Sequence, residues 1–169
     1  MTQFDILAHS ADADALLDLL NLAFGPGRIT RTAERLREGN QRVVAYDRVA
    51  LDKQQNLVGA ISFWPIKIAD TGGLLLGPLA VHPDMQGQGV GLALMQDALA
   101  AVDDNRFGFT LLVGDLPYYR KSGFAIAPTT VRLPGPVDPQ RLLWRGNDAS
   151  GNQITDKLSG LVRRAPELC

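Results

Sequence analysis

Residues 73–102 constrain the fold of this chain more than any other stretch, because an apolar run leads through a glycine-rich loop into a helical pattern. The run GLLLGPLAV is short enough for a buried strand. After the turn at residues 82–84, residues 86–91 (QGQGVG) place three glycines at alternate positions. The apolar residues that follow recur on one helical stripe: Leu94, Met95, Ala98, Leu99 and Val102. The sequence therefore predicts a strand, a glycine loop and a helix in succession.

A glycine loop that opens a helix is suited to binding phosphate groups. Glycine lets the backbone come close to a ligand and adopt a positive φ. A helix N-terminus adds unpaired N–H groups and the positive end of the helix dipole. We therefore expect a phosphate site at residues 86–91, with a plain glycine turn as the alternative.

Two well-known phosphate-binding loops do not fit these residues. A P-loop requires Lys and then Ser or Thr after its last glycine, but Leu92 and Ala93 follow Gly91. A dinucleotide-binding loop that begins at Gly87 would need its third glycine at position 92 and an acidic residue near position 107, which is Phe107. Both mismatches count against a nucleotide-binding α/β domain.

The loop resembles the Q/R-x-x-G-x-G/A motif of the GCN5-related N-acetyltransferases (the GNAT family), which binds the pyrophosphate of acetyl-CoA. Residues 86–91 match every fixed position of that motif. Residues 119–124 (YRKSGF) resemble the family's Y-x-x-x-G-F segment, one helix and one strand further along. The chain is most similar to predicted N-acetyltransferases of the YhbS type, through GPLAVHPDMQGQGVG and VGDLPYYRKSGF.

The resemblance implies an α/β (α+β) fold. We expect a central mixed, mostly antiparallel sheet of about seven strands, a splayed parallel pair formed by the fourth and fifth strands, and about four helices. Periodicity and turn residues agree with this order and make residues 1–169 a single domain with a polar tail from about residue 146. The expected strands outside residues 74–81 are 2–7, 42–52, 57–68, 107–113, 124–126 with 131–133, and 141–144. The expected helices besides the one after the loop begin within 10–14 and span 31–38 and 118–122.

Composition favours an ordinary globular protein of the cytoplasm. The chain has 169 residues, is 46% hydrophobic and carries a net charge of −1, so it lacks the basic footprint of a nucleic-acid-binding protein. No apolar run reaches the roughly 18 residues that would cross a membrane, and the N-terminus does not resemble a signal peptide. Cys169 is the single cysteine, and no His/Cys cluster suggests a metal. Oligomeric state stays open, with a homodimer among the options.

The resemblance also assigns roles to individual residues. Backbone groups of Leu79, Ala80 and Val81 would bind the pantetheine arm, with the Leu79 amide directed at the thioester carbonyl as an oxyanion contact. The cofactor-binding residues would then include Gln86, Gly87, Gln88, Gly89, Val90, Gly91 and Tyr118. Tyr119 would be the general acid that protonates the departing CoA thiolate, with Tyr118 as the fallback. The reaction would be acetyl transfer from acetyl-CoA to a small-molecule or peptide amine in a ternary complex, without a metal.

The chain departs from the family pattern at two places. Relatives carry an asparagine after the fifth strand, whereas this chain has Gly114-Asp115, and we expect Asp115 to cap the next helix. Residues 74–81 contain no acidic residue to act as general base. We expect a structural role for His82. Glu34, Asp70 and a water chain stay open as alternatives for the general base, and the sequence does not select one of them.

The missing base keeps a second hypothesis open, in which the chain is a CoA-binding regulatory module with degenerate catalysis. The acceptor would lie near residues 24–37 and 128–136. An anionic acceptor would be favoured if the side chains of Arg28, Arg31 and Arg35 faced it, although a solvated helix face explains them equally well. Pro78 lies inside the expected fourth strand, where it indicates either a bulge or a strand start.

Overall fold

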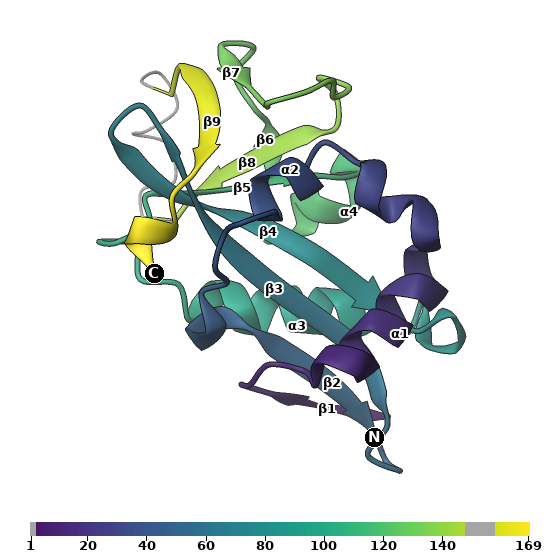
Figure 1. The fold of residues 1–169 in the computed structure, drawn as a ribbon. Helices are drawn as coiled ribbons and strands as arrows, with labels where there is room; N and C mark the ends of the chain where they lie inside the picture. The colour runs from purple at the N-terminus through teal and green to yellow at the C-terminus, as the bar shows by residue number, and fades with distance from the viewer. Residues whose placement is uncertain (1–2, 148–157) are drawn as a thin grey trace. The chain divides into compact units, whose positions relative to one another are not determined.

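The computed structural model describes residues 3–147 and 158–169 (Figure 1). Within them lie four α-helices: α1 (Ala13–Phe24), α2 (Glu34–Arg37), α3 (Val90–Ala100) and α4 (Leu116–Tyr119). The strands are β1 (Phe4–Leu7), β2 (Arg48–Asp52), β3 (Leu57–Ile68), β4 (Thr71–Val81), β5 (Phe109–Val113), β6 (Ala125–Ile126), β7 (Val131–Arg132), β8 (Leu142–Gly146) and β9 (Gly160–Arg164). Four helices confirm the expected number, but the described residues form nine strands rather than about seven.

The strands form a mixed sheet in the hydrogen-bonding order β1-β2-β3-β4-β5-β8-β6. β4 and β5 are parallel, as predicted, with Gly73, Leu74 and Leu75 opposite Phe109, Thr110 and Leu111. β9 was not predicted; it pairs antiparallel with β3 and parallel with β7. The predicted strand that would have joined residues 124–126 to 131–133 is therefore two separate strands with different partners.

The chain forms two compact units, and the long strands β3 and β4 contribute to both. Unit 1 comprises residues 1–29, 43–63 and 77–101, and it holds α1, α3 and the glycine loop. Unit 2 comprises residues 30–42, 64–76 and 102–169, and it holds α2, α4 and strands β5 to β9.

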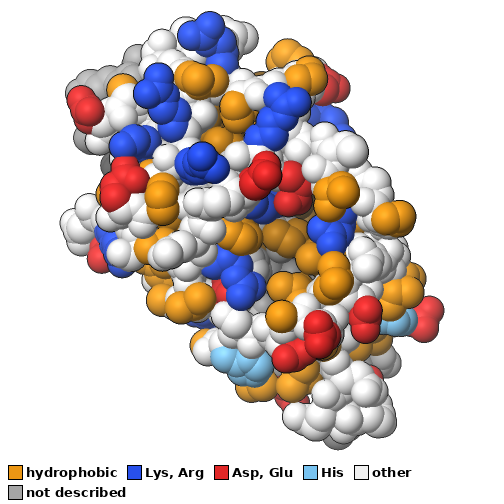
Figure 2. Space-filling model, viewed as in Figure 1, with side chains coloured by type: hydrophobic (Ala, Val, Ile, Leu, Met, Phe, Trp, Pro, Cys, Tyr) orange, Lys and Arg blue, Asp and Glu red, His pale blue; other side chains and the backbone are white. Residues whose placement is uncertain are grey.

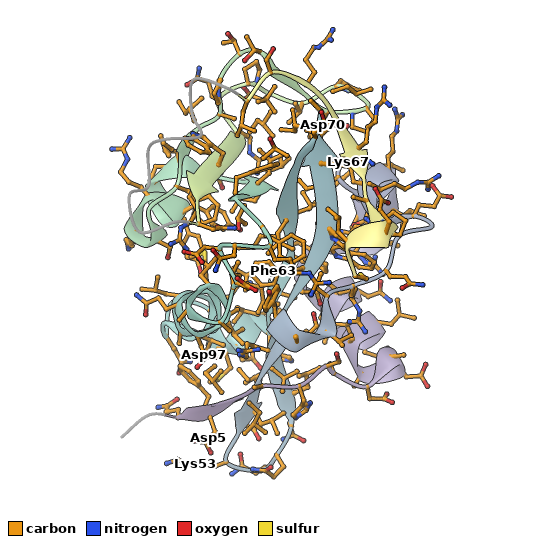
Figure 3. All side chains as sticks on the ribbon, turned by 90° about the vertical axis from the view of Figure 1, so that its left-hand side faces the viewer. Asp5, Lys53, Phe63, Lys67, Asp70 and Asp97 are labelled. Atoms are coloured by element: carbon orange, nitrogen blue, oxygen red, sulfur yellow. The ribbon has the colours of Figure 1, made fainter. Side chains whose placement is uncertain are left out.

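In unit 1, α1 and α3 cover opposite faces of the strands (Figures 1 and 3). The alternation of side chains along β3 explains this arrangement, because neighbouring residues point to opposite faces. Ala60 packs with Leu19 and Leu20 of α1. At Gly59, an added Cβ would lie 2.8 Å from Val90 and 2.9 Å from Leu94 of α3. The missing side chain at Gly59 therefore lets the helix after the glycine loop pack closely on the sheet.

Unit 2 has its own core, in which side chains of β5, β8 and β9 pack together. Phe109, Leu111, Trp144 and Val162 are buried in one cluster. Gly73 leaves room for the Phe109 ring, since an added Cβ would lie 2.4 Å from it. The C-terminal segment is held to the same unit, where Lys67 pairs with Glu167 and Arg106 donates to the carbonyl of Leu168. The segment expected to be a polar tail contains β9 because β3 and β7 supply hydrogen-bonding partners for it.

Several predicted boundaries moved. Residues 44–46 form a 3₁₀ turn, so the second strand starts at Arg48 instead of at residue 42. The helix predicted over residues 31–38 is shortened to α2. β4 starts at Thr71 instead of residue 74, after a turn around Ala69, whose φ is 49°. Residues 148–157 of the predicted polar tail lie outside the described residues. Within the described ranges, no helix combines the length and apolar character needed to cross a membrane.

Candidate active site

The predicted cofactor-binding residues of unit 1 follow one another along the end of β4, the glycine loop and the start of α3. Ala80 is fully buried against α1, which fixes the end of the strand, while its neighbours Leu79 and Val81 are half-buried. The His82 N–H donates to the Val58 carbonyl at 2.8 Å and holds this strand end to β3. The loop that follows therefore starts from a rigid point.

The loop itself adopts the backbone geometry that its glycines permit. Gly87 has a φ of 76°, and Gly89, which precedes α3, has a φ of 85° in the left-handed region. Neither residue has another atom within 4 Å of where a Cβ would be, so both face open space. A non-glycine residue here would meet no clash within the protein, and its cost would come from the backbone conformation.

The amides at this helix start are available to a ligand. The N–H groups of Met85, Gln86 and Gln88 donate to carbonyls of the loop itself. In contrast, α3 has no side-chain cap and no acidic residue in its first turn. Among the described residues, no acceptor binds the N–H groups of Gly87, Gly89, Val90, Gly91 or Leu92. Free N–H groups at the positive end of a helix dipole are suited to an anion, and the phosphate site at residues 86–91 stays a prediction.

His82 has a structural role, as expected. It precedes a 3₁₀ turn over Pro83–Met85, and its ring nitrogen Nδ1 accepts from the Asp84 N–H at 3.3 Å. The side chain of Gln88 adds a second bond across the loop, from Nε2 to the Asp84 carbonyl at 2.9 Å. The loop is therefore braced by its own side chains.

In unit 2, Tyr119 lies against the end of β5. An added Cβ at Gly114 would be only 2.2 Å from Cε2 of its ring. The ring also meets Tyr118 at 5.0 Å and Phe124 at 6.0 Å, edge to face in both cases. Tyr118 is more exposed than Tyr119, with 39% of its surface accessible. The structure therefore encloses Tyr119 more than Tyr118.

The pKa of Tyr119 is raised to about 12, chiefly because the phenol is buried, and the neighbouring Tyr118 and Asp115 contribute to the rise. Arg141 and Arg37 act in the opposite sense but do not cancel the effect. Burial also raises the pKa of Tyr118. Tyr119 therefore keeps its proton throughout the physiological pH range and is a hydrogen-bond donor there.

Asp115 occupies the N-cap position of α4, but its side chain does not cap the helix. Its carbonyl accepts from the N–H groups of Tyr118 and Tyr119, while its carboxylate accepts from Nε of Arg141 at 3.2 Å. The expectation that the Asp115 side chain caps this helix is therefore wrong. The carboxylate is used instead to fasten α4 to the segment before β8.

The other side chains considered for acid–base chemistry or acceptor binding are either bonded to a partner or exposed in a turn. Glu34 pairs with Arg37, and Asp70 is exposed in the turn between β3 and β4, where Figure 3 shows it near Lys67. Arg35 donates to the carbonyl of Pro134 at 2.7 Å, so it braces a loop. Figure 2 shows Lys and Arg side chains gathered toward β9 and β7, with acidic side chains among them. Nowhere in the described parts of the chain do three potential metal ligands converge.

The model of the acetyltransferase (GNAT) domain matches residues 39–126, more than half of the chain. The chain belongs to the GNAT family of acetyltransferases. The match includes β4, the glycine loop, α3, β5 and both tyrosines.

Relatives of this acetyltransferase agree with the assignment. The uncharacterized N-acetyltransferase YhbS of Escherichia coli is 25% identical over 118 residues, which cover 69% of this chain and 70% of that protein. The crystal structure of E. coli YhbS in complex with CoA superposes with a TM-score of 0.78 at 20% identity, covering 98% of this chain and 91% of that one. A GNAT family acetyltransferase from Brucella melitensis, in complex with acetyl-CoA, is 26% identical with a TM-score of 0.59, covering 85% and 96%.

Sequence reasoning missed one feature of this acetyltransferase, the contact between Gly114 and Tyr119. Gly114 was noted only as a departure from an asparagine. Its spacing of five residues before Tyr119 carries no signal by itself, because the contact depends on how α4 turns back against β5.

Proposed function

We propose that this chain transfers the acetyl group of acetyl-CoA to a primary amine by direct attack in a ternary complex. The observation that carries the proposal is the uncapped start of α3, where five N–H groups without acceptors in the described structure surround two glycines open to solvent. The bound CoA and acetyl-CoA of the E. coli and B. melitensis structures support the same ligand here.

In the proposed complex, amides of residues 86–91 bind the pyrophosphate of the cofactor. Backbone groups of Leu79, Ala80 and Val81 bind the pantetheine arm, and Tyr118 contributes a contact to the cofactor. The Leu79 N–H donates to the thioester carbonyl oxygen and stabilises the negative charge that develops there. Leu79 and Val81 are half-buried, so this end of β4 keeps some surface that a ligand can contact.

The chemical step joins the amine nitrogen to the acetyl carbon and breaks the carbon–sulfur bond. The amine loses one proton to solvent through a water chain, and the CoA sulfur gains one from Tyr119, which solvent then reprotonates. Proton transfer from Tyr119, with a pKa of about 12, to a thiolate with the pKa of a free thiol, about 8.5, would be uphill by about 5 kcal/mol. Desolvation beside Tyr119 raises the pKa of a bound thiol as well, so the difference narrows in the complex.

A calorimetric titration with acetyl-CoA tests the first part of this proposal, with CoA and ATP as comparisons. We expect acetyl-CoA and CoA to bind and ATP to bind far more weakly. The Gly89→Glu variant should lose binding, since it places a carboxylate where the pyrophosphate would lie. If neither acetyl-CoA nor CoA binds, the proposed function is refuted, and only the assignment of the fold stands.

The alternative of a regulatory module with degenerate catalysis rests on the absence of an acidic residue in residues 74–81. An assay of thiol release separates the two functions, with acetyl-CoA and a panel that includes an alkyl amine, an amino acid amide and an amino sugar. Amine-dependent release supports the enzyme. Tight CoA binding without release over the whole panel supports the module.

A further inference from the structure

We propose that Gly114 is a positioning residue: the absence of a side chain at this point lets the Tyr119 ring lie against the end of β5, which fixes the direction of its hydroxyl group. The catalytic consequence of this inference rests on the proposed function of Tyr119. The structural part does not, because it concerns only where the ring lies.

The distance between the two residues carries the inference. A Cβ built at Gly114 would lie 2.2 Å from Cε2 and 2.9 Å from Cδ2 of Tyr119, whereas ordinary contact begins at 3.4 Å. The ring therefore occupies the space that any other residue type would fill. Gly114 does not have a positive φ, so alanine meets no backbone penalty there and the conflict with the ring is steric.

The backbone on both sides of this contact is held in place. The Gly114 N–H donates to the Arg141 carbonyl at 2.9 Å, which extends the pairing of β5 with β8 by one residue. The Arg141 side chain also binds Asp115. Neither the strand end nor the first residue of the turn is therefore free to retreat from an added methyl group.

Tyr119 is fixed from its own side as well. Its N–H donates to the Asp115 carbonyl at 3.3 Å, and its carbonyl accepts from the Phe124 N–H at 3.4 Å. Phe124 is only 2% exposed, so this end of the segment is anchored in the core. With both backbones anchored, the part that must move is the ring, by on the order of 1 Å or more, a displacement that can change a rate by about 100-fold.

The first experiment follows the ring without any assay of activity. Tyrosinate absorbance at pH 11 is measured for four proteins: wild type, Tyr119→Phe, Gly114→Ala, and the double variant. The difference within each pair isolates Tyr119 from the other two tyrosines. A phenol of pKa about 12 is about one-tenth ionised at pH 11, and an exposed phenol of pKa about 10 is about nine-tenths ionised.

We expect Gly114→Ala to raise the ionised fraction of Tyr119 from the lower toward the higher value, while circular dichroism at the same pH shows a folded protein. Gly73→Ala is the matched control, because its Cβ would press on the Phe109 ring at 2.4 Å in the same unit but away from Tyr119. That variant should leave the Tyr119 titration unchanged. An unchanged titration in Gly114→Ala would overturn the inference.

A stability cycle keeps the inference testable if Gly114→Ala folds poorly. Gly114→Ala should lower the urea midpoint in the wild-type background. It should lower the midpoint much less in the Tyr119→Leu background, because the shorter leucine side chain leaves space for the added methyl group. Equal effects in both backgrounds would show that Gly114 acts on something other than this ring, and the inference would fail.

Turnover of acetyl-CoA then links position to chemistry. Gly114→Ala should lower kcat about 10- to 100-fold with little change in the KM for acetyl-CoA, and it should have no further effect in the Tyr119→Phe background. Full activity of Tyr119→Phe would refute the proposed catalytic role of Tyr119. In that case the titration and the urea cycle would still decide where Gly114 holds the ring.

Discussion

Replacing Gly89 with alanine separates the backbone requirement of the loop from its ligand-binding requirement. Gly89 has a φ of 85°, and nothing lies within 4 Å of the position of its missing Cβ. Placing an L-residue in the left-handed region costs about 1–2 kcal/mol. For a chain of this length, that loss lowers Tm by roughly 2–8 °C.

The effect on the ligand is expected to be separate and measurable. The methyl group points into the open space where the pyrophosphate is proposed to lie, so we expect CoA affinity to fall at least about 10-fold, equivalent to about 1.4 kcal/mol. Differential scanning calorimetry with and without CoA measures both effects in one experiment. In wild type, CoA at about 100 times its Kd should stabilise the fold by about 2.7 kcal/mol.

Gly25→Ala provides the control for this experiment. Gly25 ends α1 in the same unit, has a φ of 72° and also faces open space. Alanine there should lower Tm at least as much as in Gly89→Ala but leave CoA affinity unchanged. A Gly89→Ala protein with wild-type affinity would refute the placement of the pyrophosphate over this loop, and one with wild-type Tm would refute the backbone argument.

Three further predictions concern other residues. Tyr119→Phe should lower kcat by about 10²- to 10⁴-fold with near-normal CoA binding, as judged by thiol release and calorimetry, and unchanged turnover would exclude Tyr119 as the acid. Because the pKa of Tyr119 is raised to about 12 in the folded protein, its contribution to stability is complete below pH 10 and is lost between pH 10 and 12, by about 2–3 kcal/mol in all. Urea unfolding should therefore show the free energy of unfolding of wild type falling over this range relative to that of Tyr119→Phe. Parallel pH dependences of the two proteins would contradict this prediction. Gly59→Val should destabilise unit 1 by about 1–3 kcal/mol, because its side chain would press on Val90 and Leu94, and a urea midpoint equal to wild type would mean that α3 is free to move away.

Sequence patterns predicted the elements that short-range rules control. The strand, loop and helix over residues 73–102 were found because β-type apolar runs, alternate glycines and helical periodicity are all local signals. The end of α1 at Gly25 and the left-handed Gly123 after the tyrosine segment follow a short-range rule too, since glycine ends helices in conformations that other residues avoid.

Elements that depend on distant partners were missed. β9 was overlooked because five residues beside a polar segment form a strand only when β3 and β7 supply the hydrogen bonds. Val44 and Tyr46 favoured a strand at residues 44–46. Tyr46 is instead buried beside Phe63 in a 3₁₀ turn, because tertiary packing overrode local propensity. The cap expected from the Asp115 side chain was lost to Arg141, which lies 26 residues further along the chain.

The sequence by itself determined the family of this protein, because the family is encoded in residue identities over short spacings, in residues 86–91 and 119–124. The same short spacings predict the phosphate-binding role that we propose for residues 86–91. Only the tertiary structure decided the surroundings of those residues. In the folded protein the Tyr119 ring packs against Gly114, and Arg35 donates to the carbonyl of Pro134. The amides at the start of α3 have no acceptors among the described residues. Burial and hydrogen bonding depend on which distant segments meet, and no local pattern in the chain specifies that.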